Sequence, residues 1–372
     1  MFALEPELGP LPTQLELLAA VMSMVPLQRL LSARRALTGR PAKDRAALAT
    51  AFIAKAILNL GTTRDLIGRL KVDEPLRRLC GWSSASKLPH EAKFSRAFAE
   101  FAVSELPQQL HAAVVEVALK DQLMGHVAHD STAIPLRERY PDSAKATQQP
   151  KAKKKGKKGK KGEKGKHARA KAAERGTRIQ RQRHQTLEKM LNDLPKNCDC
   201  GAKIGSQGFK AGWRGVKLHL SVADGQLPVG AVLTSASVHD SQVAIPLMEI
   251  TSRRIDSCYD LLDSAYAAEA LYAHSEHLNH VPIIALHPRR ATTKKPVELE
   301  KVFPGKLMPQ LSPAQTERYK QRTMSERVNG RLKDEFGGRQ IRVRGAVKVM
   351  AHLMFGVVAL AVDQILRMAA PS

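Results

Sequence analysis

The chain of 372 residues is long enough to bury a sizeable core and to form two domains. Its hydrophobic fraction of 43% suits a globular protein, and its four cysteines are too few for a secreted disulfide framework, so we expect a reducing cytoplasm. The formal net charge of +25 favours a polyanionic partner, because Lys and Arg neutralise phosphates and release counterions.

The positive charge has two separate sources. Residues 151–190 hold 17 Lys or Arg against three Glu, and the rest of the chain is also net basic. Because the tract has no interleaved apolar anchors, we expect nucleic acid and not a membrane as the partner. No basic-then-apolar segment opens the chain, and the apolar stretch 349–362 is too short to span a bilayer, so it predicts a buried helix.

The first part of the chain, residues 1–120, is predicted to be helical. Apolar residues recur near a 3.6-residue period in 13–25, 44–60 and 105–119, and Gly or Pro residues separate these segments. We therefore expect an all-α N-terminal domain.

From residue 121 to residue 372 the pattern changes to short apolar runs that alternate with amphipathic segments. The expected elements are a strand at 125–134, a hairpin of 213–222 and 229–236, a helix after 240, a strand at 258–263, a helix at 267–274, a strand at 281–286, a helix over 319–333 and an apolar C-terminal helix. Asp240 is expected to cap its helix, and His129 to be a core or turn residue that faces away from Asp130. This order predicts a mixed α/β sheet covered by helices.

A basic low-complexity insert at 141–195 interrupts that second domain. It is rich in Lys and Gly and cannot bury a core, so we expect it to be disordered. Its densest cations are candidates for non-specific DNA binding: Lys153, Lys154, Lys155, Lys157 and Lys158. A merely solvated insertion is the alternative, and neither interpretation lets the insert specify a DNA sequence.

Three carboxylates stand at suggestive positions: Asp130 within the first strand, Asp263 at the end of a later strand, and Glu326 on a helix. Taken alone, each is explained by a turn, a cap or a solvated helix face. Together they offer the hard oxygen ligands that Mg²⁺ or Mn²⁺ needs, and two such ions can clamp both the attacking and the leaving oxygen of a phosphodiester.

The helix that carries Glu326 has a distinctive face. Tyr319, Arg322, Glu326 and Lys333 are spaced so that an ideal α-helix places them within an arc of about 60°. We call these four residues the mixed-charge face. A carboxylate that holds metal, flanked by cations that hold phosphates, suits phosphoryl transfer, whereas a charged solvated helix is the simpler alternative.

The pattern Tyr, two residues, Arg, three residues, Glu, six residues, Lys resembles the DDE transposases of bacterial insertion sequences. The segments H-D-S-T around Asp130 and L-L-D-S-A-Y around Asp263 are similar to the same family. The N-terminal segment L-C-G-W…K-L-P-H-E-A-K-F-S-R-A-F resembles the helical domain that precedes the catalytic core in such enzymes. The likeness extends over nearly the whole chain apart from the lysine tract.

This resemblance implies an RNase H-like catalytic core in which Asp130, Asp263 and Glu326 bind two Mg²⁺ or Mn²⁺ ions. It also implies that Tyr319 and Arg322 contact DNA near the cleaved end and that Lys333 contacts the phosphate backbone. The expected activity is cleavage at the terminal inverted repeats of the element and strand transfer into target DNA, by a homodimer in the nucleoid-associated part of the cytoplasm.

Two departures and three rivals accompany this interpretation. The lysine-rich insert has no place in the family pattern, and the 63 positions from Asp263 to Glu326 are too few for the large β-insertion of some relatives. The rivals are a non-catalytic architectural DNA-binding protein, an RNase H-like nuclease without strand transfer, and a transposase copy that has lost activity.

Overall fold

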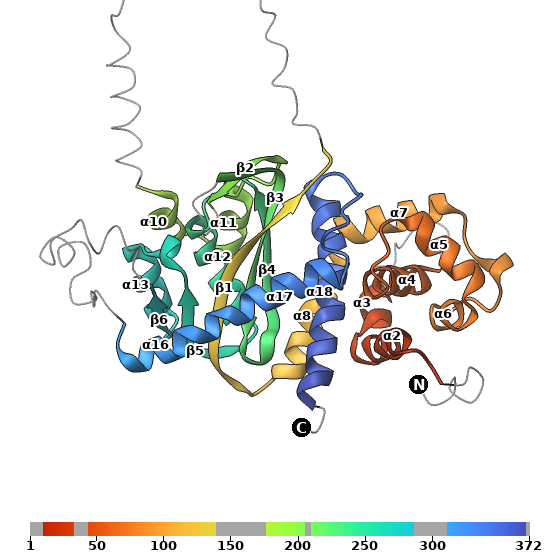
Figure 1. Ribbon diagram of the computed structural model, residues 1–372, viewed down its shortest axis with the longest axis horizontal. Coiled ribbons are helices and arrows are strands. Elements are labelled where there is room, and N and C mark those ends of the chain that lie inside the picture. The colour runs from red at the N-terminus through yellow and green to blue at the C-terminus, as the bar shows by residue number, and fades with distance from the viewer. Residues whose placement is uncertain (1–9, 33–43, 139–175, 205–209, 286–310, 370–372) are drawn as a thin grey trace, which may run out of the picture.

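The computed structural model describes residues 10–32, 44–138, 176–204, 210–285 and 311–369. Within these ranges a group of helices at the N-terminal end lies beside a mixed sheet that carries helices on both faces (Figure 1). The predicted lysines Lys153, Lys154, Lys155, Lys157 and Lys158 lie outside the described residues.

The described part of residues 1–120 is helical, as its periodicity predicts. The helices are α2 Thr13–Met24, α3 Leu27–Ser32, α4 Arg45–Ile57, α5 Thr63–Val72, α6 Glu74–Leu79, η1 Ala85–Lys87, α7 Glu91–Val103 and α8 Leu106–Leu119. Local capping starts α5, since the Thr62 hydroxyl accepts from the Asp65 amide while the Asp65 carboxylate accepts from the Thr62 amide.

The sheet of the second part is mixed. Its strands are β1 Leu123–Pro135, β2 Asp199–Ile204, β3 Lys210–Ala223, β4 Leu227–Ser235, β5 Asp256–Leu262 and β6 Val281–Ile284. They run in the order β2-β3-β1-β5-β6, and β4 pairs with β3. The expected hairpin is β3–β4, closed by η2 Asp224–Gln226, in which Gly225 takes a φ of 73° that suits glycine. Strand β1 is antiparallel to β3 and parallel to β5.

Helices cover both faces of this sheet. They are α10 Arg178–Gln182, α11 Leu187–Asp193, α12 Ser241–Ser252, η3 Ser264–Tyr266, α13 Glu269–His277, α16 Pro313–Tyr319, η4 Lys320–Arg322, α17 Thr323–Asp334 and α18 Ala346–Ala369. Successive residues of β5 show the two faces, because Leu261 packs in the core that includes α18 whereas Leu262 packs with α12 and α13. Helix α17 runs diagonally across β1 and β3 (Figure 1).

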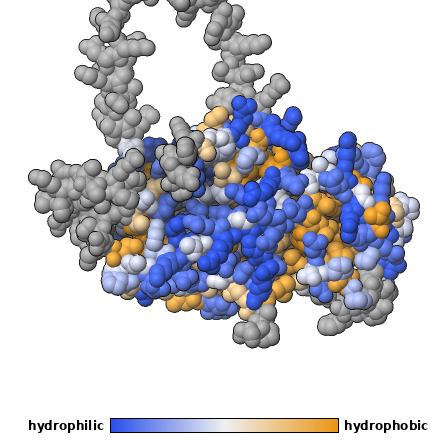
Figure 2. Space-filling model, viewed as in Figure 1, coloured by the Kyte–Doolittle hydropathy of each residue, from blue (hydrophilic) through white to orange (hydrophobic). Residues whose placement is uncertain are grey.

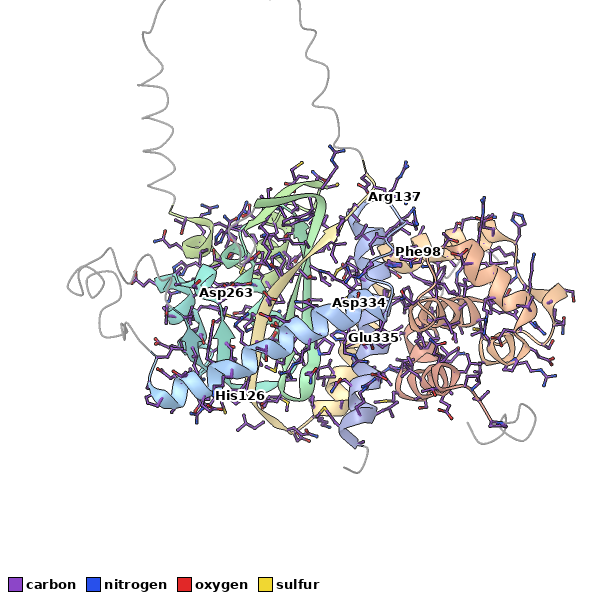
Figure 3. The ribbon with its side chains drawn as sticks, viewed as in Figure 1. Phe98, His126, Arg137, Asp263, Asp334 and Glu335 are labelled. Carbon is purple, nitrogen blue, oxygen red and sulfur yellow. The ribbon has the colours of Figure 1, made fainter. Side chains whose placement is uncertain are left out.

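One apolar core joins the N-terminal helices to the sheet. Helix α18 lies at its centre: the Phe355 ring stacks 5.9 Å from the Phe52 ring and lies 6.3 Å from the Phe98 ring, which is labelled in Figure 3. Within the described residues, α18 is the one helix long and apolar enough to cross a membrane by length and composition, and 72% of its most apolar window is buried inside the protein. This is the buried C-terminal helix that the sequence predicts.

Three sequence expectations need correction. Residues 176–195, which we placed in the disordered insert, contain α10 and α11, and α10 is held through hydrogen bonds from Arg178 and Gln182 to Gln242. The single helix expected over 319–333 is divided by the 3₁₀ turn η4. The Asp240 side chain makes no capping hydrogen bond.

Candidate active site

Strand register brings Asp130 and Asp263 together. Strands β1 and β5 are parallel neighbours, with Ala128 opposite Leu261. Two residues further along each chain stand Asp130, within β1, and Asp263, directly after the last residue of β5, so both side chains emerge on the same face of the sheet. We call these two residues the aspartate pair; Asp263 is labelled in Figure 3.

The electrostatics of the pair fit a cation site. Burial raises the pKa of Asp130 to about 6, and the charge of Asp263 adds to this, against the opposing effects of a hydrogen bond from the Ser131 amide and of the cations Arg322 and Lys203. Asp263 Oδ1 accepts from the Ala265 amide at 2.8 Å, which holds its side chain at the start of η3.

Glu326 is held by Arg322. Arg322 Nη2 donates to Glu326 Oε1 at 2.9 Å, and the Arg322 guanidinium lies 5.6 Å from the centre of the Tyr319 ring. The pKa of Tyr319 is raised by burial and then by the charges of Asp263 and Glu326, so its hydroxyl lies near acids from both the sheet and the helix. Three residues of the mixed-charge face therefore remain neighbours despite the 3₁₀ turn.

The start of this helical segment is anchored to the sheet by stacked rings. The Arg318 guanidinium lies 4.7 Å above the centre of the Tyr259 ring on β5, and that ring stacks on His126 of β1 at 5.4 Å. His126, labelled in Figure 3, is itself held by Asp224, whose Oδ1 is 3.0 Å from His126 Nδ1. Arg318 is thus held against β5 and β1, and this contact positions Tyr319, the next residue in the chain.

Among the described residues, no group of three His, Cys, Asp or Glu side chains is close enough to hold a metal ion. Glu326 stands apart from the aspartate pair, with 56% of its side chain exposed. The donor chemistry of the pair nevertheless fits Mg²⁺ or Mn²⁺, since Asp130, whose pKa is raised by burial and by the charge of Asp263, lies where a divalent cation would relieve the repulsion between the two carboxylates.

Asn329 belongs to this site, although no sequence pattern singled it out. Its Nδ2 donates to Asp130 Oδ2 at 3.1 Å, and the residue is 6% exposed. Lys333, one turn further along α17, is half-buried, and its pKa is lowered by burial and then by the nearby cations Arg339 and Lys203. A single asparagine within a helix shows no periodicity or motif, so sequence alone offers no reason to select it.

Asp240 binds a lysine of the sheet and does not cap its own helix. Its Oδ1 accepts from Lys217 Nζ at 2.9 Å, and its carboxylate also bonds to Ser131, the neighbour of Asp130. Burial, and then the charges of Asp240 and the aspartate pair, raise the pKa of Tyr266 well above its usual value. The Tyr266 hydroxyl finds no hydrogen-bond partner among the described residues. The expected capping role of Asp240 is wrong because the Lys217 ammonium, on β3, binds the carboxylate.

The outer surface of α17 is strongly polar. On the face seen in Figure 2, hydrophilic side chains gather over α16 and α17. Asp334 pairs with Arg339 and Glu335 with Arg331 at the C-terminal end of α17, away from Asp263 (Figure 3). These two acids are therefore exposed partners of arginines and not members of the site.

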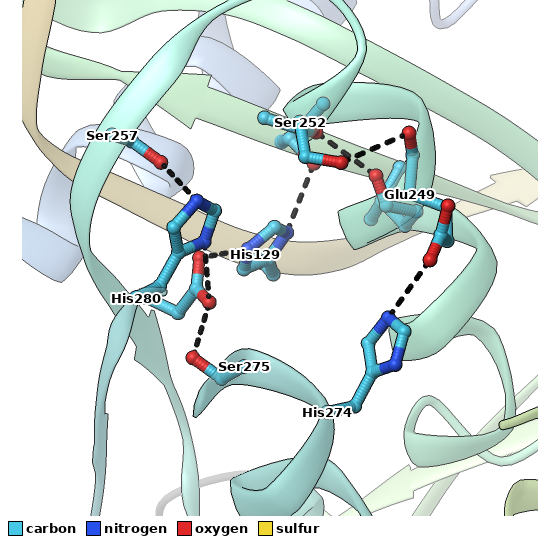
Figure 4. A network of polar contacts seen from close by, with 11 residues as sticks. His129, Glu249, Ser252, Ser257, His274, Ser275 and His280 are labelled. Atoms are coloured by element: carbon cyan, nitrogen blue, oxygen red, sulfur yellow. Dashed lines mark hydrogen bonds and ion pairs between the residues drawn. The ribbon is translucent and has the colours of Figure 1, made fainter. Parts of the chain in front are cut away.

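A buried polar network lies on the other face of β1 (Figure 4). His129, 1% exposed, contacts Ser221 Oγ at 2.9 Å and Asp260 Oδ1 at 3.3 Å. Asp260 also accepts from Ser275 and from His280 Nδ1, the latter at 3.1 Å. These bonds hold the pKa of Asp260 below its usual range in spite of its burial. His129 is thus a core residue facing away from Asp130, as alternation predicts.

Two family models match the chain. A model described as Transposase DDE domain matches residues 121–362, and one described as Transposase domain (DUF772) matches residues 7–100. No curated protein and no solved structure matches significantly. The first match spans the sheet, α17 and most of α18, and so includes the aspartate pair and the mixed-charge face.

Proposed function

Since the chain belongs to the DDE transposases, we propose that it cuts DNA at the ends of an insertion sequence and transfers the cut strand into target DNA. The observation that carries this proposal is the aspartate pair on adjacent parallel strands, with Asp130 within β1 and Asp263 directly after β5, beside a helix that presents Glu326. A mixed sheet in which β1 is antiparallel to β3 and parallel to β5 supports the RNase H-like core that the family resemblance implies.

We assign Asp130, Asp263 and Glu326 as the residues that would hold the divalent ions, Mg²⁺ or Mn²⁺. When bound, such ions activate water and stabilise the charge that develops on a phosphodiester. Asp130 and Asp263 supply carboxylates from the rigid sheet, whereas Glu326 supplies one from α17. Arg322 restrains Glu326 through its 2.9 Å ion pair and keeps a positive charge beside the site, where a scissile phosphate would need it.

DNA is the proposed substrate and partner. Tyr319 and Arg322 would contact the cleaved end, and Lys333, with Lys203 and Arg339 nearby, would contact the phosphate backbone. The lysine tract would add affinity without sequence preference. The N-terminal helices would read the terminal inverted repeats and support a homodimer acting on DNA in the cytoplasm.

The proposal is tested with a DNA duplex that bears the end of the element. Wild-type protein should nick this duplex and join its 3′ end to target DNA in Mg²⁺, while Asp130→Asn, Asp263→Asn and Glu326→Gln should abolish both steps. Glu335→Gln, which changes an exposed acid further along the same helical segment, is the matched control and should remain active.

The outcomes separate the rivals. Nicking of the duplex without joining to target DNA would indicate a nuclease that lacks strand transfer, and not a transposase. DNA binding without any metal-dependent nicking would favour an architectural protein or an inactive copy, and cleavage that survives in all three site variants would refute the site itself.

A further inference from the structure

We propose that Asn329 is a positioning residue that orients Asp130 for the divalent ion; the inference rests on the proposed function. Asn329 lies outside the Tyr, Arg, Glu and Lys pattern. Its side chain contacts Asp130, which is 199 positions away in sequence.

The geometry places Asn329 at the centre of the helix–sheet contact. It lies three residues after Glu326 and four before Lys333, so all three side chains share one side of α17. Its Nδ2 donates to Asp130 Oδ2 at 3.1 Å, while the Ser131 amide also bonds to the Asp130 carboxylate. With two donors on it, the carboxylate is restrained in rotation.

Burial of this amide needs a reason. Asn329 is 6% exposed, and its Oδ1 finds no hydrogen-bond donor among the described residues. An unsatisfied buried acceptor costs roughly 1–3 kcal/mol. The neighbouring buried positions of α17 hold Val328 and Leu332, which pack without that cost. The contact with Asp130 is the compensation that the structure offers for an amide at this position.

The amide also suits the chemistry better than the alternatives. A carboxylate there would add a third negative charge beside the aspartate pair, and a lysine would neutralise Asp130 and oppose a metal ion. An amide N–H orients the carboxylate and leaves its charge available. Partners of this kind, which hold a metal ligand without touching the metal, typically contribute about 10- to 100-fold in metal affinity or activity.

A matched control exists for the competing explanation, in which Asn329 only docks the helix. Asn59 Nδ2 donates to the Asp334 carbonyl oxygen at 2.8 Å, at the C-terminal end of the same helix, and Asn59 Oδ1 is also buried without a partner among the described residues. Asn59 therefore makes a similar amide contact with α17, but not with a carboxylate of the site.

The experiment measures Mn²⁺ binding to the full chain by electron paramagnetic resonance, with and without the element-end duplex, together with thermal unfolding in EDTA. We expect Asn329→Ala to weaken Mn²⁺ binding about 10- to 100-fold, and Asn59→Ala to bind Mn²⁺ within about twofold of wild type. Asn329→Ser, a smaller polar substitution, should show the same loss of affinity and serves if the alanine variant does not fold.

Wild-type Mn²⁺ affinity in both Asn329 variants would overturn the inference, and so would an equal loss of affinity in Asn59→Ala. Asp130→Asn distinguishes the two proposals. If Asp130→Asn abolishes Mn²⁺ binding while the Asn329 variants bind normally, the proposed function stands and this inference fails. A wild type that neither binds Mn²⁺ nor cleaves DNA in its presence refutes both.

Discussion

Arg322 Nη2 lies 2.9 Å from Glu326 Oε1, one helical turn away, and the same guanidinium exerts its charge on Asp130. One cation thus links the acid on the helix with an acid on the sheet. The Arg322 side chain is 21% exposed and the Glu326 side chain 56% exposed, so this ion pair contributes little to the stability of the fold. Its importance therefore lies in placing Glu326.

This relationship predicts that Arg322→Gln lowers DNA cleavage by at least about tenfold while leaving the thermal unfolding midpoint nearly unchanged, because an exposed ion pair contributes only about 0–1 kcal/mol. Single-turnover cleavage and differential scanning fluorimetry measure the two effects. Arg253→Gln, which removes an exposed partner of Glu249 at the C-terminal end of α12, is the control. A large loss of stability in Arg322→Gln would show that the pair supports the fold instead.

The lysine tract predicts a change in the salt dependence of DNA binding. Residues 151–171 contain 12 Lys or Arg, and the slope of log affinity against log salt should become shallower by roughly 0.9 for each phosphate that the protein no longer neutralises. We expect a protein in which this tract is replaced by a Gly/Ser segment of equal length to bind DNA more weakly, with a shallower slope, while retaining Mg²⁺-dependent nicking. Fluorescence anisotropy across a salt series measures the slope, and an unchanged slope would contradict a DNA-binding role.

Buried histidines predict loss of stability in acid. Burial lowers the pKa of His352 to about 4, and its Nε2 bonds to the Gly337 carbonyl oxygen at 3.0 Å. Below the unfolded value of about 6.5, the unfolded chain binds a proton that the native chain does not, so the free energy of unfolding falls as the pH drops from about 7 towards 4. His111 and His219, with pKa values lowered by burial to about 3 and about 4, act in the same direction.

The variant His352→Gln can keep the bond to the carbonyl but does not bind a proton in the unfolded state. We therefore expect its free energy of unfolding to fall by about 2 kcal/mol less than that of the wild type between pH 7 and pH 5. Urea unfolding at a series of pH values measures this difference. The exposed His184 supplies the control, because His184→Gln should follow the wild-type profile. Identical pH profiles for His352→Gln and wild type would mean that burial does not lower the pKa of His352 below its unfolded value.

The aromatic contact between Phe52 and Phe355 predicts a large effect on stability. Phe355→Ala should reduce the free energy of unfolding by about 3–5 kcal/mol, because it leaves a cavity between α4, α7 and α18. Val347→Ala, on the same helix with 54% exposure, should change it by about 0.5 kcal/mol or less. Guanidinium unfolding measures both, and similar values for the two variants would contradict the shared core.

Periodicity was sufficient to predict that the N-terminal part is helical and to locate α2, α4 and α8, as well as the β3–β4 hairpin and α18, because these elements have long and regular apolar patterns. Helices α10 and α11 were missed because they are short and lie in a basic segment. Local rules also failed for Asp240: capping preference describes a residue and its own helix, whereas Lys217 reaches it from a strand. Asn329 could not be selected for the same reason, since its partner is far away in sequence.

The placement of α18 has a consequence for how the molecule can be divided. A fragment beginning at residue 121 would retain every member of the aspartate pair and the mixed-charge face, yet it would expose the side of α18 on which Phe52 and Phe98 pack. The sequence boundary between the two family matches is therefore not a boundary at which the protein can be cut into independent working parts. The N-terminal helices and the sheet have to be kept together when the protein is truncated, exchanged or engineered.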